Sequence, residues 1–324
     1  MRKYLFLNFF LLMVVGSVAH AQTAPTSYPA RPVRFIVPGP PGSSQEVLAR
    51  IVGNKLSQQM GQSFVVDARA GASGMIGLEA ARTAAPDGYT LLAATSTLLS
   101  GLPALKPKLG YDPDRDFIAL SRMASVANIV TVGASLNVDT AADFVKLAKA
   151  RPGQLNFGSA GNGSPAHLAG AMLNVLAGVN TVHVPYKGSA QALVDIMAGQ
   201  LQFIITSPLI AMPQAKSGRI KLLATTGAKR DPLLPDLPVF ADVVPGYEIT
   251  QWWGIVLPAG AAPAISHRLH SEIITALTSP EVAGLLAKQG ATAQPESPAA
   301  FSAFMRAERK RIAHIGKQAN IVLD

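Results

Sequence analysis

A strand, a loop of small residues and an amphipathic helix follow one another early in this chain, and that pattern constrains its fold most. Residues 33–37 (Val-Arg-Phe-Ile-Val) predict a buried strand, and residues 38–44 hold three prolines and two glycines, which exclude a helix or a central strand. Apolar residues between 47 and 56 fall on one face of a helix, and residues 64–66 form the next strand. This is a β-α-β unit, so we expect an α/β protein.

The same order returns in the second half of the chain. A strand at residues 155–157 leads into the loop 158–164, Pro165 opens an amphipathic helix, and residues 182–184 form a strand. The two units share little sequence identity, so we interpret them as similar structural units and not as a proven sequence repeat. They predict two α/β domains, each with a small-residue loop at the carboxyl end of its first strand, where ligands bind in open α/β sheets.

Further elements are expected along the rest of the chain. The predicted strands are residues 89–93, 201–205, 222–225 and 252–257, and the predicted helices are residues 190–197, 264–278, 280–289 and 298–318. A proline-punctuated connection covers residues 231–238.

Both loops end at a predicted helix N-terminus, which binds anions because its first amides are unpaired and its dipole end is positive. Local capping is the competing interpretation. Ser43 and Glu46 fit a capping box, and Ser164 before Pro165 fits an N-cap followed by proline at the first helical position. The two roles are compatible, because neighbouring amides stay free.

The N-terminus predicts export. Residues 1–21 combine a basic start, an apolar run and an Ala-His-Ala end, which is typical of a signal peptide cleaved after Ala21; an uncleaved membrane anchor is the alternative. Cleavage leaves 303 residues from Gln22, with 26 basic against 19 acidic residues and a net charge of +7. No later apolar stretch is long enough to span a membrane. We therefore expect a soluble periplasmic protein.

Composition and motifs exclude several classes of function. The chain has no cysteine, so it has no disulfide scaffold, Cys-ligated zinc, iron–sulfur cluster or thiol nucleophile. Residues 161–166 match a loose dinucleotide pattern, but no acidic residue follows at the spacing that holds a ribose. His267 and His270 indicate a solvated helix face rather than a metal site. We expect neither a cofactor nor a metal.

The net charge of +9 raises the question of an acidic partner. Basic residues gather only in the last helix, at Arg306, Arg309, Lys310 and Arg311, where the simplest interpretation is a solvated face opposite an apolar one. Aromatic residues make up 6% of the chain and do not alternate with the basic ones, so nucleic-acid binding is not expected.

Short segments spread over nearly all of the mature chain resemble one receptor family. They are residues 28–38, 40–42, 48–50, 65–67, 85–91 (Ala-Pro-Asp-Gly-Tyr-Thr-Leu), 155–159, 164–170, 184–188 (Val-Pro-Tyr-Lys-Gly), 234–238 and 252–254 (Trp-Trp-Gly). In this order they resemble the periplasmic solute receptors of tripartite tricarboxylate transporters, the TctC-like or Bug family. The resemblance implies a two-domain periplasmic-binding-protein fold (type II-like) that closes on a small carboxylate in a cleft between the domains. It also implies a membrane permease as partner.

The resemblance also implies domain boundaries and ligand contacts. Domain 1 would hold residues 22–126 and 249–324, and domain 2 residues 127–248. The first loop is residues 38–46 and the second loop is residues 159–164. The implied ligand-binding residues are Gly39, Pro40, Pro41, Gly42, Ser43, Ser44, Glu46, Ser73, Ser96 and Thr97 in domain 1, and Ser159, Ala160, Gly161, Asn162, Ser164, His167, Tyr186, Lys187 and Thr206 in domain 2.

Departures from the family pattern bear on the ligand. Gly39 stands where the family usually has an aromatic residue, which predicts a wider site, and Ser43 stands at the second glycine. Glu46 replaces a loop aspartate, and Thr206 aligns with another aspartate. Because an acid that would orient an ammonium group is missing or displaced, we expect a dicarboxylate or an aromatic acid rather than an amino acid.

Three classes of function remain at this point. The favoured one is a monomeric, non-enzymatic receptor that works by hinge closure. A sensor that feeds a regulatory kinase would use the same binding chemistry. An exported α/β enzyme would need a base beside a nucleophile, and the two loops offer serines but one histidine, His167, without an orienting acid.

Overall fold

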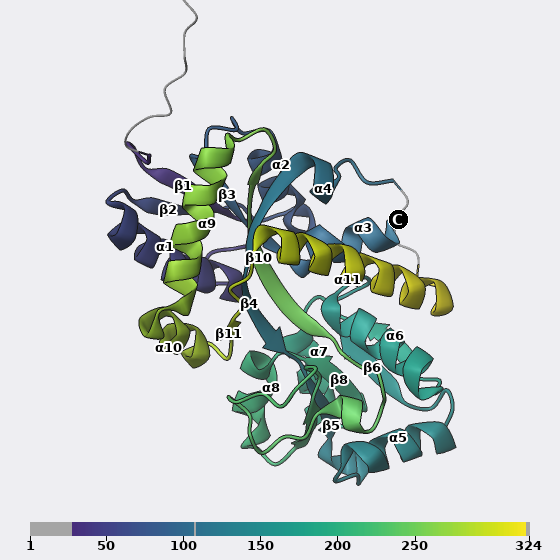
Figure 1. Cartoon of the computed structure of the whole chain (residues 1–324). Coiled ribbons are helices and arrows are strands. Elements are labelled where there is room, and N and C mark those ends of the chain that lie inside the picture. Colours follow the sequence, from purple (N-terminus) through teal and green to yellow (C-terminus); the bar gives the residue numbers. More distant parts are fainter. Residues whose placement is uncertain (1–27, 107, 322–324) are drawn as a thin grey trace, which may run out of the picture.

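The computed structural model describes residues 28–106 and 108–321, so the predicted signal peptide lies outside the described residues. Within those ranges the strands form a six-stranded sheet and a five-stranded sheet. In Figure 1 the first sheet and its helices lie above the second, and the long strands β4 and β10 run between them. The predicted α/β architecture is confirmed.

The first sheet has the strand order β11-β4-β10-β3-β1-β2. Strand β1 pairs in parallel with β2 and β3, while β10 is antiparallel to β3 and β4. Its strands are β1 Val33–Val37, β2 Phe64–Ala68, β3 Thr90–Thr95, β4 Phe117–Ala127, β10 Thr250–Pro258 and β11 Thr292–Ala293. The helical segments of this part are α1 Ser44–Met60, η1 Ala72–Gly74, α2 Met75–Arg82, the π-helix η2 Thr97–Gly101, α3 Leu102–Leu105, α4 Pro113–Asp116, α9 Pro263–Thr278, α10 Pro280–Lys288 and α11 Pro298–Gln318.

The second sheet has the order β7-β6-β8-β5-β9. Strand β6 pairs in parallel with β7 and β8, and β5 is antiparallel to β8 and β9. Its strands are β5 Ile129–Gly133, β6 Asn156–Ser159, β7 Val182–Pro185, β8 Phe203–Thr206 and β9 Ile220–Thr225. The helical segments between them are η3 Ala134–Leu136, α5 Ala141–Ala150, α6 Pro165–Ala177, α7 Ser189–Met197, α8 Pro208–Ala215 and η4 Phe240–Asp242.

Helices cover both faces of the first sheet, which explains why its strands read as continuous apolar runs. On β1, Phe35 points into a core shared with α1, α9 and α10, whereas Ile36 points into a core shared with α2, η2 and α11. Both side chains are fully buried. The second sheet is likewise packed between α5 and α6 on one face and α7 and α8 on the other.

The chain passes between the two sheets at one hydrogen-bonded cluster. Asn128 separates β4 from β5, Thr226 follows β9, and Ile249 precedes β10. The Asn128 amide donates to Thr226 Oγ1 (3.0 Å), the Thr226 amide donates to the Asn128 carbonyl (2.9 Å), and the Ile249 amide donates to the Thr226 carbonyl (3.0 Å). All three residues are buried, so the crossing strands are tied together at this point.

Helix α11 joins the two parts of the molecule, and here one sequence-based expectation is wrong. Its start packs on the first sheet through Phe301, while Ile315 near its end belongs to the core of the second sheet. Arg309 forms an ion pair with Asp114, and Arg311 donates to the Glu248 carbonyl. The basic face is therefore not simply solvated, because these two side chains fasten the helix to neighbouring segments.

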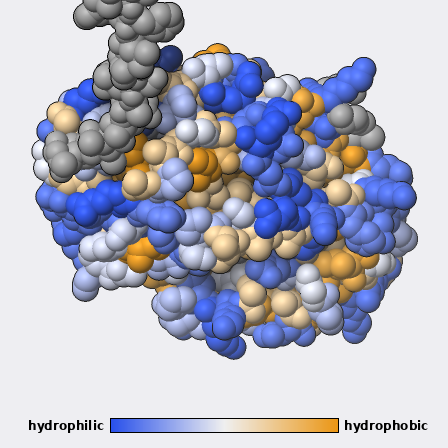
Figure 2. Space-filling model, turned by 45° about the horizontal axis from the view of Figure 1, so that its top comes forward, coloured by the Kyte–Doolittle hydropathy of each residue, from blue (hydrophilic) through white to orange (hydrophobic). Residues whose placement is uncertain are grey.

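The predicted elements occur with ends shifted by a few residues, but strands β4, β5 and β11 and helices α2, α3, α4, α5 and α8 were not predicted. Strand β4 contains alanines and serines, and a single residue, Asn128, separates it from β5, so no glycine or proline marks where one strand ends and the next begins. In the part of the chain that the structure describes, no helix is long and apolar enough to cross a membrane. Figure 2 shows separate apolar patches among hydrophilic residues on one face of the molecule.

Candidate functional site

The first loop follows β1 and turns sharply before α1. The Ser43 amide donates to the Pro40 carbonyl (3.2 Å), and Gly42 between them has φ +78°. Proline at the second and glycine at the third position of such a turn fit the type II geometry, which needs a positive φ at the third. The sequence Pro-Pro-Gly-Ser therefore places the N-terminus of α1 directly after the carboxyl end of β1.

The predicted capping box is not formed. Ser43 is the N-cap residue of α1, but its side chain caps no amide. Glu46 reaches past it to accept from the Gly42 amide (3.3 Å) and from Arg50 one turn later. The Arg50 guanidinium and the turn amide hold the buried Glu46 carboxylate, so that the reciprocal bond to Ser43 is not made.

The Ser43 hydroxyl oxygen is buried and has no hydrogen-bond partner among the described residues. A buried hydroxyl without a partner costs free energy, so its presence at a helix N-terminus indicates that something else supplies the bond. A bound anion meets that requirement beside the unpaired first-turn amides of α1.

The Gln45 side chain lies beside Gly39, where the sequence predicts a wider site. A Cβ atom built on Gly39 would lie 1.6 Å from the side-chain nitrogen of Gln45. The Gln45 amide therefore occupies the space that a side chain at position 39 would enter. Sequence reasoning missed Gln45, because a polar residue in the first turn of a helix gives no sign that its side chain folds back over the loop.

Two further segments of the first part meet the first loop. A Cβ on Gly74, next to Ser73, would lie 3.1 Å from both the Pro38 carbonyl oxygen and a Leu98 methyl, so η1, η2 and the loop are in close contact. Ser96 and Thr97 open η2 and are partly exposed. The segments that contain Ser73 and Thr97 therefore lie close to the first loop.

The second loop is held from within. The Ser159 hydroxyl is buried, accepts from the Gly161 amide (3.0 Å) and donates to the Gly161 carbonyl (3.0 Å). The Ser164 amide donates to the Gly161 carbonyl (3.2 Å), and Gly161 and Gly163 have φ of +106° and +73°. These positive angles explain why glycine stands at both places.

The cap predicted at Ser164 is confirmed. The His167 amide donates to Ser164 Oγ (3.4 Å), and Pro165 occupies the first helical position of α6. Asn162 is exposed at the tip of the loop.

Two histidines lie behind the second loop, one of which sequence reasoning missed. His167 Nδ1 accepts from the Gly163 amide (3.0 Å), and His183 Nε2 lies 2.6 Å from Ser159 Oγ. The two rings stack with centroids 3.9 Å apart and planes 16° apart, and Phe157 lies beside His183 at 5.0 Å. His183 comes from β7, the neighbour of β6, so only the parallel pairing of these strands reveals it.

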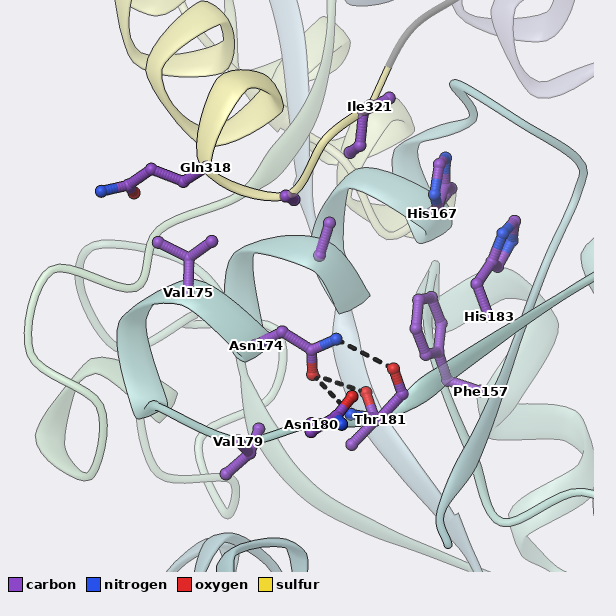
Figure 3. A pocket seen from close by; sticks show the side chains of 12 residues that line it. Phe157, His167, Asn174, Val175, Val179, Asn180, Thr181, His183, Gln318 and Ile321 are labelled. Carbon is purple, nitrogen blue, oxygen red and sulfur yellow. Dashed lines mark hydrogen bonds between the residues drawn. The ribbon is translucent and has the colours of Figure 1, made fainter. Parts of the chain in front are cut away.

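A cavity of about 400 Å³ adjoins this histidine pair (Figure 3). Segments of α6, β7 and the end of α11 line it, and no residue of the first loop does. The Asn174 side chain lies in the wall of this cavity and is already hydrogen-bonded there to the Thr181 amide (3.0 Å), carbonyl (2.9 Å) and hydroxyl (2.7 Å). Within the described residues no group of three or more His, Asp or Glu side chains is placed to hold a metal.

The pKa values of both histidines lie below their usual range. Burial lowers the pKa of His167. Burial, and then the proximity of His167, lower the pKa of His183 to about 4. Both rings are therefore neutral at neutral pH, so each offers a lone pair as a hydrogen-bond acceptor.

The remaining predicted residues of domain 2 have different surroundings. The Tyr186 hydroxyl donates to Asp195 (2.7 Å), and the Tyr186 amide donates to the Ser159 carbonyl (3.0 Å). Lys187 is exposed. Thr206 is the buried last residue of β8 and not part of the loop after it.

Comparison with known proteins decides the family. The model of the tripartite tricarboxylate transporter family receptor, TctC, matches residues 48–321. The chain belongs to this family. Protein BugT of Bordetella pertussis is 33% identical over 322 residues, covering 97% of this chain and 98% of BugT. The resemblance stated from the sequence motifs is thereby confirmed.

Solved structures of similar proteins share the fold, among them the periplasmic binding protein BugD, with a TM-score of 0.75 and 28% identity over 91% of this chain and 99% of that protein. Rpa4515 of R. palustris, solved with adipate, has a TM-score of 0.79 and 34% identity, covering 91% of this chain and 99% of that protein. MatC of Rhodopseudomonas palustris, solved with bound malate, has a TM-score of 0.73 and 26% identity over 89% and 99%. The predicted periplasmic-binding-protein fold is confirmed by these similarities.

Proposed function

We propose that this TctC-family receptor captures a small carboxylate without an ammonium group and delivers it to the permease of a tripartite tricarboxylate transporter. The observation that carries the proposal is the buried Ser43 hydroxyl, which lacks a partner where a type II turn leads into the N-terminus of α1. Helix N-termini favour anions, and a carboxylate accepts bonds from both hydroxyls and amides.

The acids near the two loops support the exclusion of amino acids. Glu46 is occupied by Arg50 and the Gly42 amide, and Asp195 is occupied by the Tyr186 hydroxyl. Position 206 holds a threonine. An ammonium group entering between the loops would lose its hydration without a free carboxylate to replace it, which is costly.

The relatives support a dicarboxylate in particular. The adipate of Rpa4515 and the malate of MatC both carry a carboxylate at each end and no amino group. In this chain, two β-to-α loops end in helix N-termini, one in each sheet, and would hold the two ends. The predicted ligand-binding residues from Gly39 to Glu46 and from Ser159 to Ser164 are proposed in this role.

We propose hinge closure as the mechanism, with residues 22–126 and 249–324 as one moving domain and residues 127–248 as the other. The cluster of Asn128, Thr226 and Ile249 is the proposed hinge, because the chain crosses between the sheets there. In domain closure of this kind, a few residues at the ends of elements absorb the φ/ψ change while the domains move as units.

The catalytic alternative rests on Ser159 and His183, which lie at the 2.6 Å separation of a nucleophile and its base. Ser159 is fully buried, and its hydroxyl already bonds both polar groups of Gly161. No acid orients His183, since the cavity lining described contains no Asp or Glu. We therefore propose a receptor that performs no catalysis.

Export, the permease and the monomeric state belong to the same proposal. The proposal places the protein in the periplasm after cleavage following Ala21, as a monomer that a membrane permease recognises. A sensor kinase in place of the permease would leave the ligand chemistry unchanged. An uptake assay in cells that lack this receptor, before and after the receptor is supplied again, separates the two. A transport receptor restores uptake of the ligand, whereas a sensor restores only a transcriptional response.

Native mass spectrometry of the purified protein tests the ligand class. We expect one carboxylate molecule bound per chain, either retained from the cell or added, and its mass should match a compound without an amino group. A protein that retains glutamate or aspartate, or converts the bound molecule during incubation, contradicts the proposal.

A further inference from the structure

The histidine pair His167 and His183 makes hydrogen bonds to the second loop. His167 accepts from the Gly163 amide, and His183 contacts Ser159, which in turn bonds Gly161 (Figure 3 shows the two rings). The two glycines have positive φ, so the loop between them depends on these bonds for its shape. Each turn of the second loop is thus tied to one imidazole ring.

The His167 hydrogen bond fixes the tautomer that matters for the second loop. The single hydrogen of Ser159 Oγ can go to the Gly161 carbonyl (3.0 Å) or to His183 Nε2 (2.6 Å), so a hydrogen bond between Ser159 and His183 forms with either tautomer of His183. His167 Nδ1 accepts from Gly163, so its hydrogen sits on Nε2. Protonation leaves the His183 bond in place but puts a hydrogen on His167 Nδ1, which removes the acceptor of the Gly163 amide.

Among the described residues around the pair, no side chain supplies a counter-charge to an imidazolium. From β6 the pair is faced by Phe157 and Ser159, and from α6 by Ala171 and Asn174. The 179–181 segment and the end of α11 contribute Val, Asn, Thr, Gln, Ala and Ile side chains. Among the described residues, the one titratable group that acts electrostatically on His183 is His167, and a second positive charge in the stack would repel the first.

We propose that His167 and His183 are positioning residues that keep the second loop in its ligand-binding shape only while His167 is neutral. The inference rests on the proposed function, because it makes carboxylate affinity depend on the pair. Since burial lowers the pKa of His167, the loop is intact at neutral pH and loses the Gly163 bond as the pH falls through that lowered pKa. Release of ligand in acid follows.

Three variants test the proposal by calorimetric titration with adipate and with malate, from about pH 8 to about pH 4.5. His167→Phe keeps a ring in the stack without an acceptor, and we expect about three- to tenfold weaker binding at neutral pH. His167→Asn places an oxygen where Nδ1 stands, so we expect part of that affinity to return and its fall in acid to flatten. His267→Asn, on an exposed face of α9, should keep the pH profile of the original protein.

A ligand-free measurement separates this inference from the proposed function. In the NMR spectrum of the free protein, the Gly163 amide should shift with the same midpoint as the His167 ring, and His167→Asn should abolish that shift. If neither dicarboxylate binds but the coupled shift appears, the proposed ligand class fails and the positioning role stands. An unshifted Gly163 amide, or an equal pH profile for the original protein and His167→Asn, overturns the positioning role.

Discussion

At the residue scale, two serines with the same apparent signature have different roles. Ser164 caps α6 through its hydroxyl, whereas the Ser43 hydroxyl at the start of α1 has no partner among the described residues. Both are followed three positions later by a polar residue, Glu46 or His167. Arg50 explains only the other half of the missing capping box, because it holds the Glu46 carboxylate while the Ser43 amide donates to the Pro40 carbonyl.

Replacing Ser43 by alanine should therefore separate binding from stability. We expect the free energy of unfolding without ligand to stay within about 0.5 kcal/mol, because no bond within the described structure is lost. Carboxylate affinity should fall about three- to tenfold, since the hydroxyl is proposed to donate to the ligand. Urea unfolding and calorimetric titration measure the two quantities.

Ser164→Ala is the matched control. It removes a formed cap, so we expect a loss of about 1 kcal/mol in the free energy of unfolding. If Ser43→Ala lowered stability as much as Ser164→Ala and left affinity unchanged, Ser43 would be a structural cap and not a ligand contact.

The sequence predicted the positions of the loops better than the contacts of their side chains. Gly42 and Pro41 specify a turn through local geometry, and Ser164 before Pro165 specifies a cap. Gln45 over Gly39 and His183 beside Ser159 depend on contacts that no local pattern encodes. The expected site residues remain predictions, while their neighbours emerged from the structure.

At the element scale, the docking of α11 depends on a small residue in β10. A Cβ on Gly254 would lie 2.1 Å from the Phe301 ring, which is fully buried and meets Trp252 edge-on at 5.6 Å. Apolar periodicity predicted that α11 packs on the core. The site of its packing could not be predicted, because it depends on a glycine in a distant strand.

Gly254→Ala should displace Phe301 and lower the free energy of unfolding by about 1–3 kcal/mol, as overpacking of a core does. Gly284→Ala is the matched control, because an added methyl on this exposed helical position meets nothing within 4 Å. It should raise stability by about 0.5–1 kcal/mol through helix propensity. Equal effects of the two variants in urea unfolding would contradict the packing described.

The hydrogen bonds of the proposed hinge, Asn128, Thr226 and Ile249, give a second prediction at the element scale. Thr226→Val keeps the side-chain shape but leaves the buried Asn128 amide without its acceptor, so we expect a loss of about 1–3 kcal/mol in the free energy of unfolding. Thr275→Val, on the exposed side of α9, should change stability by less than about 0.5 kcal/mol. A Thr226→Val protein as stable as Thr275→Val would show that the crossing strands do not need this bond.

At the scale of the whole molecule, two sheets are joined by crossing strands and by α11, and each sheet contributes one of the two loops proposed to bind ligand. The strand, loop and helix pattern that occurs twice in the sequence predicted this architecture, because the spacing of apolar residues within each element can be recognised from the sequence alone. Strands β4 and β5, which carry the chain from one sheet to the other, were not predicted, since β4 contains several small residues and no turn residue separates it from β5. The proposed closure of the two domains places the two loops on opposite ends of one ligand.

Calorimetric titration of protein refolded free of ligand tests the central claim most directly, with adipate and malate compared against glutamate and aspartate. The account predicts saturable binding of at least one of the two dicarboxylates at one site per chain. It predicts binding of both amino acids that is weaker by about tenfold or more, because an unpaired ammonium group costs more than 1.4 kcal/mol. Tight binding of glutamate or aspartate, with no heat from either dicarboxylate, would contradict it.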